Sequence, residues 1–361
     1  MHKELTASGL AGLLGTVDEP FLVDVREPEE VAAWALPGVL NIPLGQLVAR
    51  AGELPGDRSL VIVCASGNRS ARASEFLHAA GFDVANLVGG MTAWGQVYDT
   101  AVVELASASV VQVRRRAKGC LSYLVGGTGE AFVVDPSLDV DVYLRLAEER
   151  GWRISRVFDT HLHADHVSGA RRLADAAGAT LHLNPADAFG FPFSPLSDGD
   201  RFDLPGGTGP SVSVLHTPGH TEGSTLFAVG DEAVLSGDTL FVDGVGRPDL
   251  AERAVEFSKN LHASLHDKVL VLDDDVMILP SHHGESVPVA PGEAVGARLG
   301  ELRSSLEPLS LDAAAFVAWA SARVGERPPN YQAIVAANMT GDAAHAERAR
   351  ALEAGPNRCS A

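Results

Sequence analysis

The sequence predicts an α/β plus α+β protein of two domains, in which a small parallel-sheet domain precedes a larger β-rich sandwich with helices on its outer faces. The chain has 361 residues, which is long for one ordinary domain. Short apolar segments alternate with helical patterns over the first hundred residues, whereas closely spaced strand candidates dominate from about residue 102. Hydrophobic residues make up 46% of the chain and charged residues 21%, a mixture that argues against intrinsic disorder.

The first domain is expected over residues 1–100. Residues 21–25 and 60–63 are apolar and partly β-branched, which is typical of buried strands. Residues 69–80 carry small and apolar side chains at helical spacing, and residues 84–88 form a third strand candidate. Because strand, helix and strand follow one another, this part is predicted to contain a parallel sheet.

The second domain is expected over residues 107–340, with the boundary near 97–106 and a charged tail over 341–361. Glycine-bearing turns separate its strand candidates, and helical patterns occur both between these candidates and after them. The strand candidates are residues 102–105, 110–113, 121–125, 131–135, 154–160, 211–216, 225–229, 233–236 and 276–279. The helical patterns are residues 140–150, 167–177, 292–305 and 311–323.

Charge and cysteine content restrict the partners and the compartment. The net charge of −19 disfavours nucleic acid and anionic membranes as partners. No apolar run approaches the roughly 20 residues that cross a bilayer, and the first residues do not resemble a secretory signal. The three cysteines, Cys64, Cys120 and Cys359, are too few and too dispersed for a disulfide framework, so we expect a cytoplasmic protein.

One cysteine lies at a predicted strand-to-helix turn. The turn consists of Cys64, Ala65, Ser66, Gly67, Asn68, Arg69 and Ser70. Small residues there permit a tight loop whose amide groups point inward, and the positive end of the following helix lies close by. Both features lower the pKa of a thiol and favour the reactive thiolate. The alternative is an inert buried cysteine, which the order of strand, loop and helix disfavours.

Residues 20–95 resemble a single-domain rhodanese. The landmarks are Asp-Val-Arg-Glu at 24–27, Pro-Gly-Val-Leu-Asn-Ile-Pro at 37–43 and Leu-Val-Gly-Gly-Met at 87–91. Residues 34–36 are Trp-Ala-Leu where this family usually has Gly-His-Ile, a departure at a structural position. The resemblance implies that Cys64 forms a persulfide, held by the loop amides with help from Arg69, and passes sulfane sulfur between thiols and sulfite.

A second motif places four metal-capable side chains within six residues, between a predicted strand and a predicted helix. These are His161, His163, Asp165 and His166. If alternate residues share a side, His161 and His163 chelate one metal ion, while Asp165 and His166 face a neighbouring position. A run of solvated loop histidines is the competing interpretation. Three further candidates lie at strand ends or turns downstream, namely His220, Asp238 and His282.

Together these motifs resemble the metallo-β-lactamase superfamily over roughly residues 107–300. The resemblance implies a four-layer αβ/βα sandwich with its metal at one edge of the two sheets. Glyoxalase II-like hydrolases in this superfamily bind two metals through all seven positions, whereas persulfide dioxygenases bind one iron through the equivalents of His161, His220 and Asp238. The segment Gly-Arg-Pro-Asp-Leu at 246–250 resembles the dioxygenases. Arg247 and Asp249 are therefore candidate substrate-binding residues beside the metal, with an ordinary loop ion pair as the alternative.

The expected activity is oxidation of a low-molecular-weight thiol persulfide to sulfite by dioxygen at one Fe(II) per chain. The fused rhodanese is expected to exchange sulfane sulfur among persulfide, sulfite and thiosulfate. Two alternatives stay open, a dinuclear zinc thioester hydrolase with an accessory rhodanese and a non-catalytic sulfur relay. The carrier thiol and the number of subunits are open as well, with a homodimer as one alternative.

Overall fold

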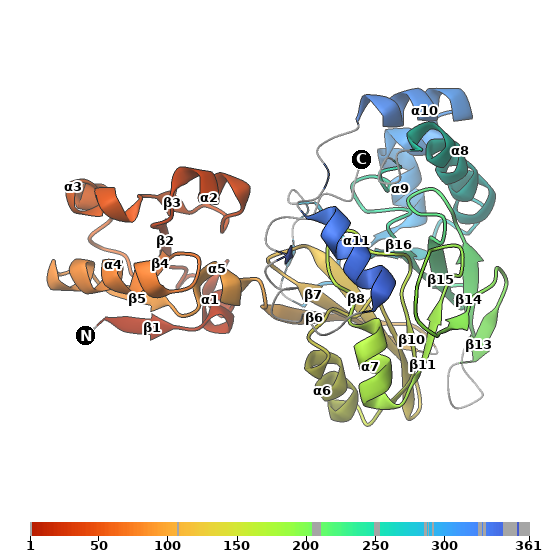
Figure 1. Cartoon of the computed structure of the whole chain (residues 1–361), viewed down its shortest axis with the longest axis horizontal. Helices are drawn as coiled ribbons and strands as arrows, with labels where there is room; N and C mark the ends of the chain where they lie inside the picture. The colour runs from red at the N-terminus through yellow and green to blue at the C-terminus, as the bar shows by residue number, and fades with distance from the viewer. Residues whose placement is uncertain are drawn as a thin grey trace. The chain divides into compact units, whose positions relative to one another are not determined.

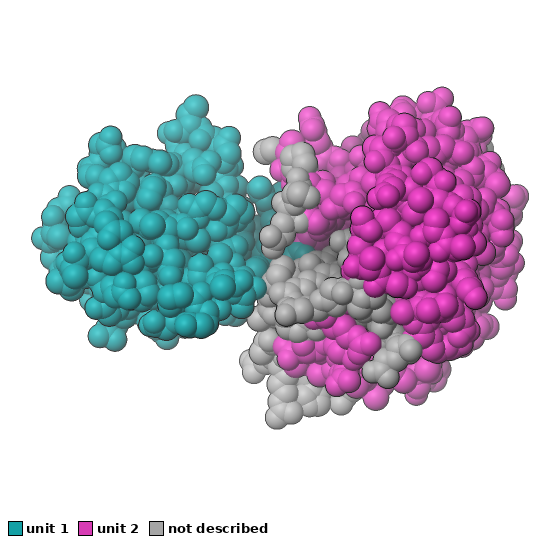
Figure 2. Space-filling model, turned by 90° about the horizontal axis from the view of Figure 1, so that it is seen from above, with its two compact units in different colours: residues 1–99, 115–118, 354–356 teal, residues 100–114, 119–353, 357–361 magenta. Residues whose placement is uncertain are grey.

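The computed structural model divides the chain into two compact units, coloured separately in Figure 2. The first unit contains residues up to Asp99 together with Arg115–Lys118, and the second contains Thr100–Arg114 and Gly119–Glu353. Each is described by itself. The structure describes residues 2–106, 108–203, 211–248, 253–284, 287, 289–290, 292–323, 327, 330–341 and 352–353.

The first unit is built on a five-stranded parallel sheet in the order β1-β5-β4-β2-β3. Its strands are β1 (Lys3–Leu5), β2 (Phe21–Asp24), β3 (Leu40–Asn41), β4 (Leu60–Val63) and β5 (Val84–Leu87). Its helices are α1 (Ala7–Leu13), α2 (Pro28–Ala33), α3 (Leu47–Arg50), α4 (Asn68–Ala79) and α5 (Gly90–Trp94). The central strand β4 is buried on both faces, because Leu60 and Ile62 pack into one apolar cluster and Val61 and Val63 into another.

The second unit contains two sheets. The seven-stranded sheet has the order β12-β11-β10-β9-β8-β7-β6, and the six-stranded sheet has the order β13-β14-β15-β16-β17-β18. The first comprises β6 (Tyr98–Glu104), β7 (Ser109–Arg115), β8 (Cys120–Gly126), β9 (Glu130–Val134), β10 (Arg153–Phe158), β11 (Thr180–Leu183) and β12 (Ser194–Pro195). The second comprises β13 (Arg201–Asp203), β14 (Ser211–His216), β15 (Thr225–Val229), β16 (Ala233–Gly237), β17 (Met277–Pro280) and β18 (Ala297–Arg298).

Helices cover the outer faces of both sheets (Figure 1). These helices are α6 (Asp141–Glu149), α7 (Ala170–Ala177), α8 (Ala254–Ser264), α9 (Leu299–Ser305) and α10 (Ala313–Ala322). Helix α11 (Tyr331–Thr340) instead packs against the loop after β10. Helices α6 and α7 contact β10 of the first sheet. Leu261 of α8, Leu302 of α9 and Phe316 of α10 pack against Val234 and Ile278 of the second sheet. The expected four-layer αβ/βα sandwich is thereby confirmed.

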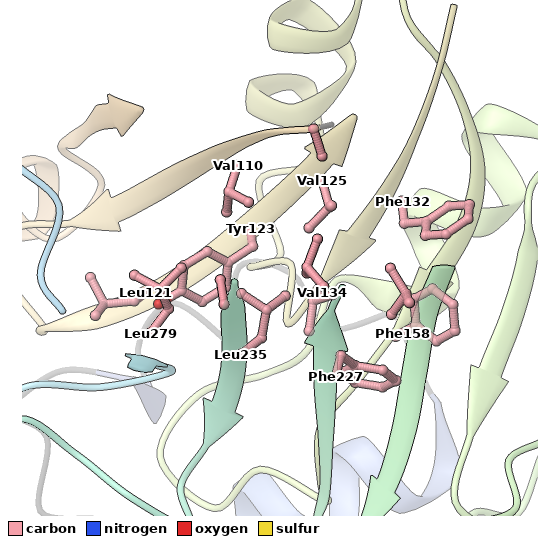
Figure 3. Packing of buried hydrophobic residues seen from close by; sticks show 14 of the residues in the cluster. Val110, Leu121, Tyr123, Val125, Phe132, Val134, Phe158, Phe227, Leu235 and Leu279 are labelled. Carbon is pink, nitrogen blue, oxygen red and sulfur yellow. The ribbon is translucent and has the colours of Figure 1, made fainter. Parts of the chain in front are cut away.

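The two sheets meet in one apolar core, shown in Figure 3. Tyr123 and Phe158 of the first sheet face Phe227, Leu235 and Leu279 of the second within this buried cluster. Alternate residues of each strand point inward, as a pleated strand requires. The core brings the ends of strands from both sheets to one edge, where the metal-capable side chains lie.

Some predicted element boundaries are wrong. The strand predicted over 154–160 ends at Phe158, and the helix predicted over 167–177 begins at Ala170, so the connecting loop is longer than expected. The helix predicted over 292–305 is confirmed only from Leu299, because Ala297 and Arg298 pair with β17 as β18. The expected tail over 341–361 and Cys359 lie largely outside the described residues. Among the described helices, none combines the length and apolarity that crossing a membrane requires.

A matched pair of valines tests how much the sandwich core stabilises the second unit. Val214 in β14 is fully buried in this core, whereas the side chain of Val271 is 68% exposed. Val214→Ala should lower the free energy of unfolding by about 2 kcal/mol, because it removes buried methyl groups and leaves a cavity. Val271→Ala should change it by less than about 0.5 kcal/mol. Urea unfolding of the full chain measures both, and equal effects would contradict the described burial.

Candidate metal centre and cysteine loop

Cys64 lies at the carboxyl end of the central strand β4, directly before helix α4. Its buried Sγ accepts hydrogen bonds from the amide of Gly67 at 3.1 Å and from the hydroxyl of Ser70 at 3.2 Å. Gly67 has a φ of 92°, and a Cβ there would lie 2.9 Å from the amide nitrogen of Gly89. This position therefore requires glycine. Ala65 contributes a carbonyl that accepts two hydrogen bonds from Thr92, and Asn68 begins helix α4.

The loop stabilises the thiolate form of Cys64. Burial raises the pKa of this thiol, but hydrogen bonds from the Ser70 hydroxyl and from the amides of Ser70, Ser66 and Gly67 outweigh burial. The pKa of Cys64 therefore lies below its ordinary value. Inward amides and the positive end of α4 also suit an anionic sulfur attached to Cys64. The loop can thus act as a nucleophile and as a cradle for a persulfide.

Arg69 forms an ion pair that the sequence did not reveal. Its guanidinium donates hydrogen bonds to both carboxylate oxygens of Glu30, each at 2.7 Å. This pairing lowers the pKa of Glu30 to about 2, and Glu30 together with the nearby Cys64 thiolate raises the pKa of Arg69. Arg69 is therefore near Cys64 but already holds a carboxylate, and its predicted catalytic role stays a prediction.

The candidate metal centre is assembled from four separate chain segments. The first is the loop after β10, which carries His161, His163, Asp165 and His166. His220 lies in the turn between β14 and β15, Asp238 directly follows β16, and His282 follows β17. All seven side chains are buried. In the structure they form three groups rather than one.

The first group joins His161, His220 and Asp238 around one point. Oδ2 of Asp238 lies 3.6 Å from Nε2 of His161 and 3.5 Å from Nε2 of His220. None of these three atoms has a hydrogen-bond partner in the described part of the chain. Two ligands bound to one ion at about 2.1 Å lie about 3.0–3.5 Å apart, so the observed spacing suits a single metal ion.

Neighbouring groups orient these three ligand atoms. Nδ1 of His220 donates to the carbonyl of Arg247 at 2.9 Å, and Nδ1 of His282 donates to Oδ1 of Asp238 at 2.6 Å. Nδ1 of His161 lies 2.8 Å from the hydroxyl of Thr160, which itself donates to a carboxylate. Protons on Nδ1 leave the lone pairs of Nε2 available to a metal. Burial also lowers the pKa of His161 and His220, which keeps both imidazoles neutral.

The second group is Cys120, Asp165, His166 and His282, and it is held together by its own charges. Asp165 lies 3.1 Å from Nδ1 of His166 and 2.9 Å from Nε2 of His282. Although burial opposes charge, the Asp165 carboxylate raises the pKa of both histidines well above the ordinary value. Cys120 is buried, and its Sγ lies 3.4 Å from Asp165. Only the pairing of Cys120 with His282 across strands brings it there.

The third group contains His163, Asp135 and Asp159. Nε2 of His163 lies 3.2 Å from Asp135 and 3.9 Å from Asp159, and these three residues form a cluster of their own. The expectation that His161 and His163 chelate the same ion stays a prediction: their ring centres lie 4.2 Å apart, while Nε2 of His163 faces Asp135. Burial raises the pKa of Asp159 to about 6, whereas His163 lowers the pKa of the equally buried Asp135 to about 2. Sequence reasoning missed Asp135, which ends a predicted strand and directly follows the observed strand β9.

Gly246 and Arg247 support the first group through their backbone. A Cβ on Gly246 would lie 1.9 Å from the carbonyl oxygen of Asp238, so only glycine permits this close approach. Arg247 is buried, and its carbonyl orients His220 as described above. Asp249 lies outside the described residues, so the proposed substrate contacts of Arg247 and Asp249 stay a prediction.

A cleft of about 640 Å³ reaches His220. Its walls come from the loops around the metal centre, from helix α8 and from helix α11. The lining residues are Leu162, Ala164, Ala186, Asp187, Ala188, His220, Thr221, Glu222, Arg253, Phe257, Tyr331, Gln332, Val335, Ala336 and Met339. A cleft of this size accommodates a small organic ligand next to the metal centre.

Known proteins match both units. The rhodanese-like domain family matches residues 6–96, and the metallo-β-lactamase superfamily matches residues 115–282. The hydroxyacylglutathione hydrolase of Methylobacillus flagellatus is 40% identical over 125 residues, which are 35% of this chain and 49% of that relative, so the chain spans about half of its length. The human mitochondrial persulfide dioxygenase ETHE1 is 30% identical over 191 residues, covering 48% of this chain and 68% of that enzyme.

The similarity extends to three dimensions. The crystal structure of ETHE1 from Myxococcus xanthus superposes with a TM-score of 0.57 and 26% sequence identity. The superposition covers 64% of this chain and 98% of that structure. Sequence similarity, fold and metal-capable side chains all assign the second unit to the metallo-β-lactamase superfamily, and sequence similarity assigns the first unit to the rhodanese-like domains. The chain belongs to the metallo-β-lactamase superfamily, and a rhodanese-like domain precedes its metallo-β-lactamase domain.

Proposed function

We propose that this chain is a persulfide dioxygenase fused to a sulfurtransferase. The dioxygenase activity is assigned to residues 107–340, with one Fe(II) per chain held by His161, His220 and Asp238, and the sulfur transfer to residues 1–100. In the overall reaction a thiol persulfide, dioxygen and water give the thiol, sulfite and two protons. The terminal sulfur loses four electrons and dioxygen gains four. The observation that carries this proposal is the group of three buried ligand atoms without hydrogen-bond partners.

The composition of that group favours iron. Two imidazoles and one carboxylate are the ligand set of non-haem Fe(II) oxygenases, and this set leaves coordination positions open for other molecules. Iron bound there would supply the electron transfer that dioxygen chemistry requires and that redox-inert zinc does not supply. The residues around the metal keep the ligands oriented: His282 holds Asp238, and the Arg247 carbonyl holds His220.

The protein also positions the substrate and excludes water. The cleft next to His220 admits a small thiol persulfide, and Phe257, Val335 and Met339 make part of its wall apolar. The ligand side chains themselves are buried, so bulk water has little access to them. We expect the terminal sulfur of the persulfide to approach the metal from this cleft.

Sulfur transfer is assigned to Cys64. A persulfide on Cys64 passes its outer sulfur to sulfite, which yields thiosulfate and regenerates the Cys64 thiolate. The amides of the loop and the Ser70 hydroxyl stabilise the anionic forms on both sides of this exchange. The two activities are chemically linked, because sulfite is a product of the first and an acceptor in the second.

The second candidate function is a dinuclear zinc thioester hydrolase. It is favoured by the 40% identity to hydroxyacylglutathione hydrolase over 125 residues and by the presence of Asp165, His166 and His282. A second ion at this group would have to replace the ion pairs that these three residues make with one another. Those pairs compensate the buried Asp165 carboxylate without a metal, which favours the mononuclear alternative, although Nε2 of His282 makes no hydrogen bond in the described part of the chain.

Metal content and oxygen uptake distinguish these functions. Protein purified without added metal should contain about one iron per chain and should consume dioxygen with a low-molecular-weight persulfide. His220→Ala should lose both, because it removes one of three ligands. About two zinc ions per chain together with thioester hydrolysis would establish the hydrolase instead. If no oxygen uptake is measured with several persulfides, the result would support the non-catalytic sulfur relay.

Replacing the candidate nucleophile separates the two activities. Cys64→Ser should lower thiosulfate formation by about 1,000-fold, because a hydroxyl does not form a persulfide. Oxygen uptake with a supplied persulfide should stay within about twofold of the original rate, since Cys64 is not among the metal-capable residues. A rate assay for each activity on the same preparation measures both, and equal loss of the two would contradict separate sites.

The loop predicts a pH dependence of sulfur transfer. Ser70→Ala removes a hydrogen bond to the Cys64 thiolate and should therefore raise the pKa of Cys64. At a pH below the pKa of Cys64 in both proteins, the variant has a smaller thiolate fraction, so its rate should be about tenfold lower than that of the original chain. At a pH above both pKa values the two rates should be equal. The acidic limb of the pH–rate profile thus moves to higher pH.

Ser74→Ala is the matched control for this profile. Ser74 is equally buried in helix α4, and its hydroxyl has no hydrogen-bond partner in the described part of the chain. The substitution should leave the acidic limb where it is. If both variants shift the profile alike, the Ser70 hydroxyl does not act on Cys64 specifically.

A further inference from the structure

The loop that carries His161, His163, Asp165 and His166 is irregular between β10 and α7. Irregular segments are usually the most mobile parts of a fold, yet a metal centre needs ligands held in one geometry. Backbone groups inside such a loop also need hydrogen-bond partners once they are buried. Four backbone groups of residues 163–168 find their partners in the far C-terminal part of the chain.

Asn338 of helix α11 makes three hydrogen bonds to this loop. Its Nδ2 donates to the carbonyl oxygens of His163 and His166, both at 2.9 Å. Its Oδ1 accepts from the amide of Ser168, also at 2.9 Å. Asn338 is buried, and these bonds use three of the four that an amide side chain can form. One side chain thus bridges both ends of the segment that contains Asp165 and His166.

Two other contacts anchor the C-terminal part on the same loop. The carboxylate of Glu353 accepts a hydrogen bond from the amide of Val167 at 2.8 Å. Ile334, one helical turn before Asn338, is fully buried and packs with Val167 and Leu138. Helix α11 is therefore fixed against the loop by packing as well as by hydrogen bonds, so Asn338 has a defined position from which to orient it.

The chemistry of Asn338 suits this task, although Asn338 also lines a small cavity of about 30 Å³ together with His161 and His163. A carboxylate at the same position would accept from Ser168 but would repel the two carbonyl oxygens that Nδ2 now satisfies. Asn338 is not among the residues that line the cleft, whereas Tyr331, Val335 and Met339 of the same helix are. The helix thus presents one side chain to the metal loop and others to the cleft.

We propose that Asn338 is a positioning residue of the metal centre, which holds residues 163–168 and thereby the position of the adjoining His161 relative to His220 and Asp238. The inference rests on the metal centre of the proposed function but is independent of whether iron or zinc is bound. In the absence of the three hydrogen bonds, two loop carbonyls and one amide lose their partners, and the ligand geometry loosens.

The test uses the full chain with Co(II) as the probe, because its absorption spectrum reports ligand geometry without turnover. Asn338→Asp and Asn338→Ala should each bind Co(II) about 10–100-fold more weakly than the original chain, with altered absorption bands. Thr340→Ala is the control, since the bonds of the exposed Thr340 hydroxyl within the described residues go to carbonyls of its own helix. This variant should bind Co(II) with the original affinity and spectrum.

Amide hydrogen exchange of the metal-free proteins provides a second readout. Residues 163–168 should exchange faster in both Asn338 variants, under conditions in which sulfur transfer by Cys64 and the overall helix content are unchanged. Original Co(II) affinity and spectrum in folded Asn338→Asp would overturn the proposal, as would unchanged exchange of the loop in both variants. Neither readout involves oxygen uptake, so a failure of the proposed dioxygenase activity is a separate result.

Discussion

The metal centre depends on a buried carboxylate that the protein alone leaves half satisfied. Asp238 accepts one hydrogen bond from His282, while its other oxygen faces the Nε2 atoms of His161 and His220. Burying charge in a low-dielectric interior costs free energy unless a partner compensates it. Neutral imidazoles whose protons lie on Nδ1 offer lone pairs rather than protons at Nε2, so they do not compensate it. A cation satisfies all three atoms at once.

Two of the other acids around this centre have partners within the protein. Asp165 is neutralised by two histidines, and Asp135 is compensated by His163 and by hydroxyl and amide donors. The same metal-capable side chains would be present whether the protein binds one ion or two. The hydrogen bonds that each acid makes bear on these alternatives: Oδ2 of Asp238 and Oδ1 of Asp159 both have no hydrogen-bond partner in the described part of the chain.

Both units place their reactive group where a strand ends. Cys64 follows the central strand of a parallel sheet, and His161 follows β10, whose neighbours on both sides run parallel to it. In the first unit amides and a helix N-terminus stabilise an anionic sulfur. In the second, neutral imidazoles and a carboxylate attract a cation instead. The same structural position thus supports nucleophilic sulfur chemistry in one unit and metal chemistry in the other.

The fold class, the Cys64 loop and the set of metal-capable residues could be predicted from the sequence alone. Each depends on local patterns of apolar spacing, turn residues and histidine motifs. The sequence did not reveal that Cys120 and Asp135 adjoin those residues, or that Asn338 supports their loop. Only the tertiary structure decided these points and divided the ligands into three groups. The reason is physical: such contacts join segments more than twenty residues apart, and their partners depend on how strands pair and how the sheets pack.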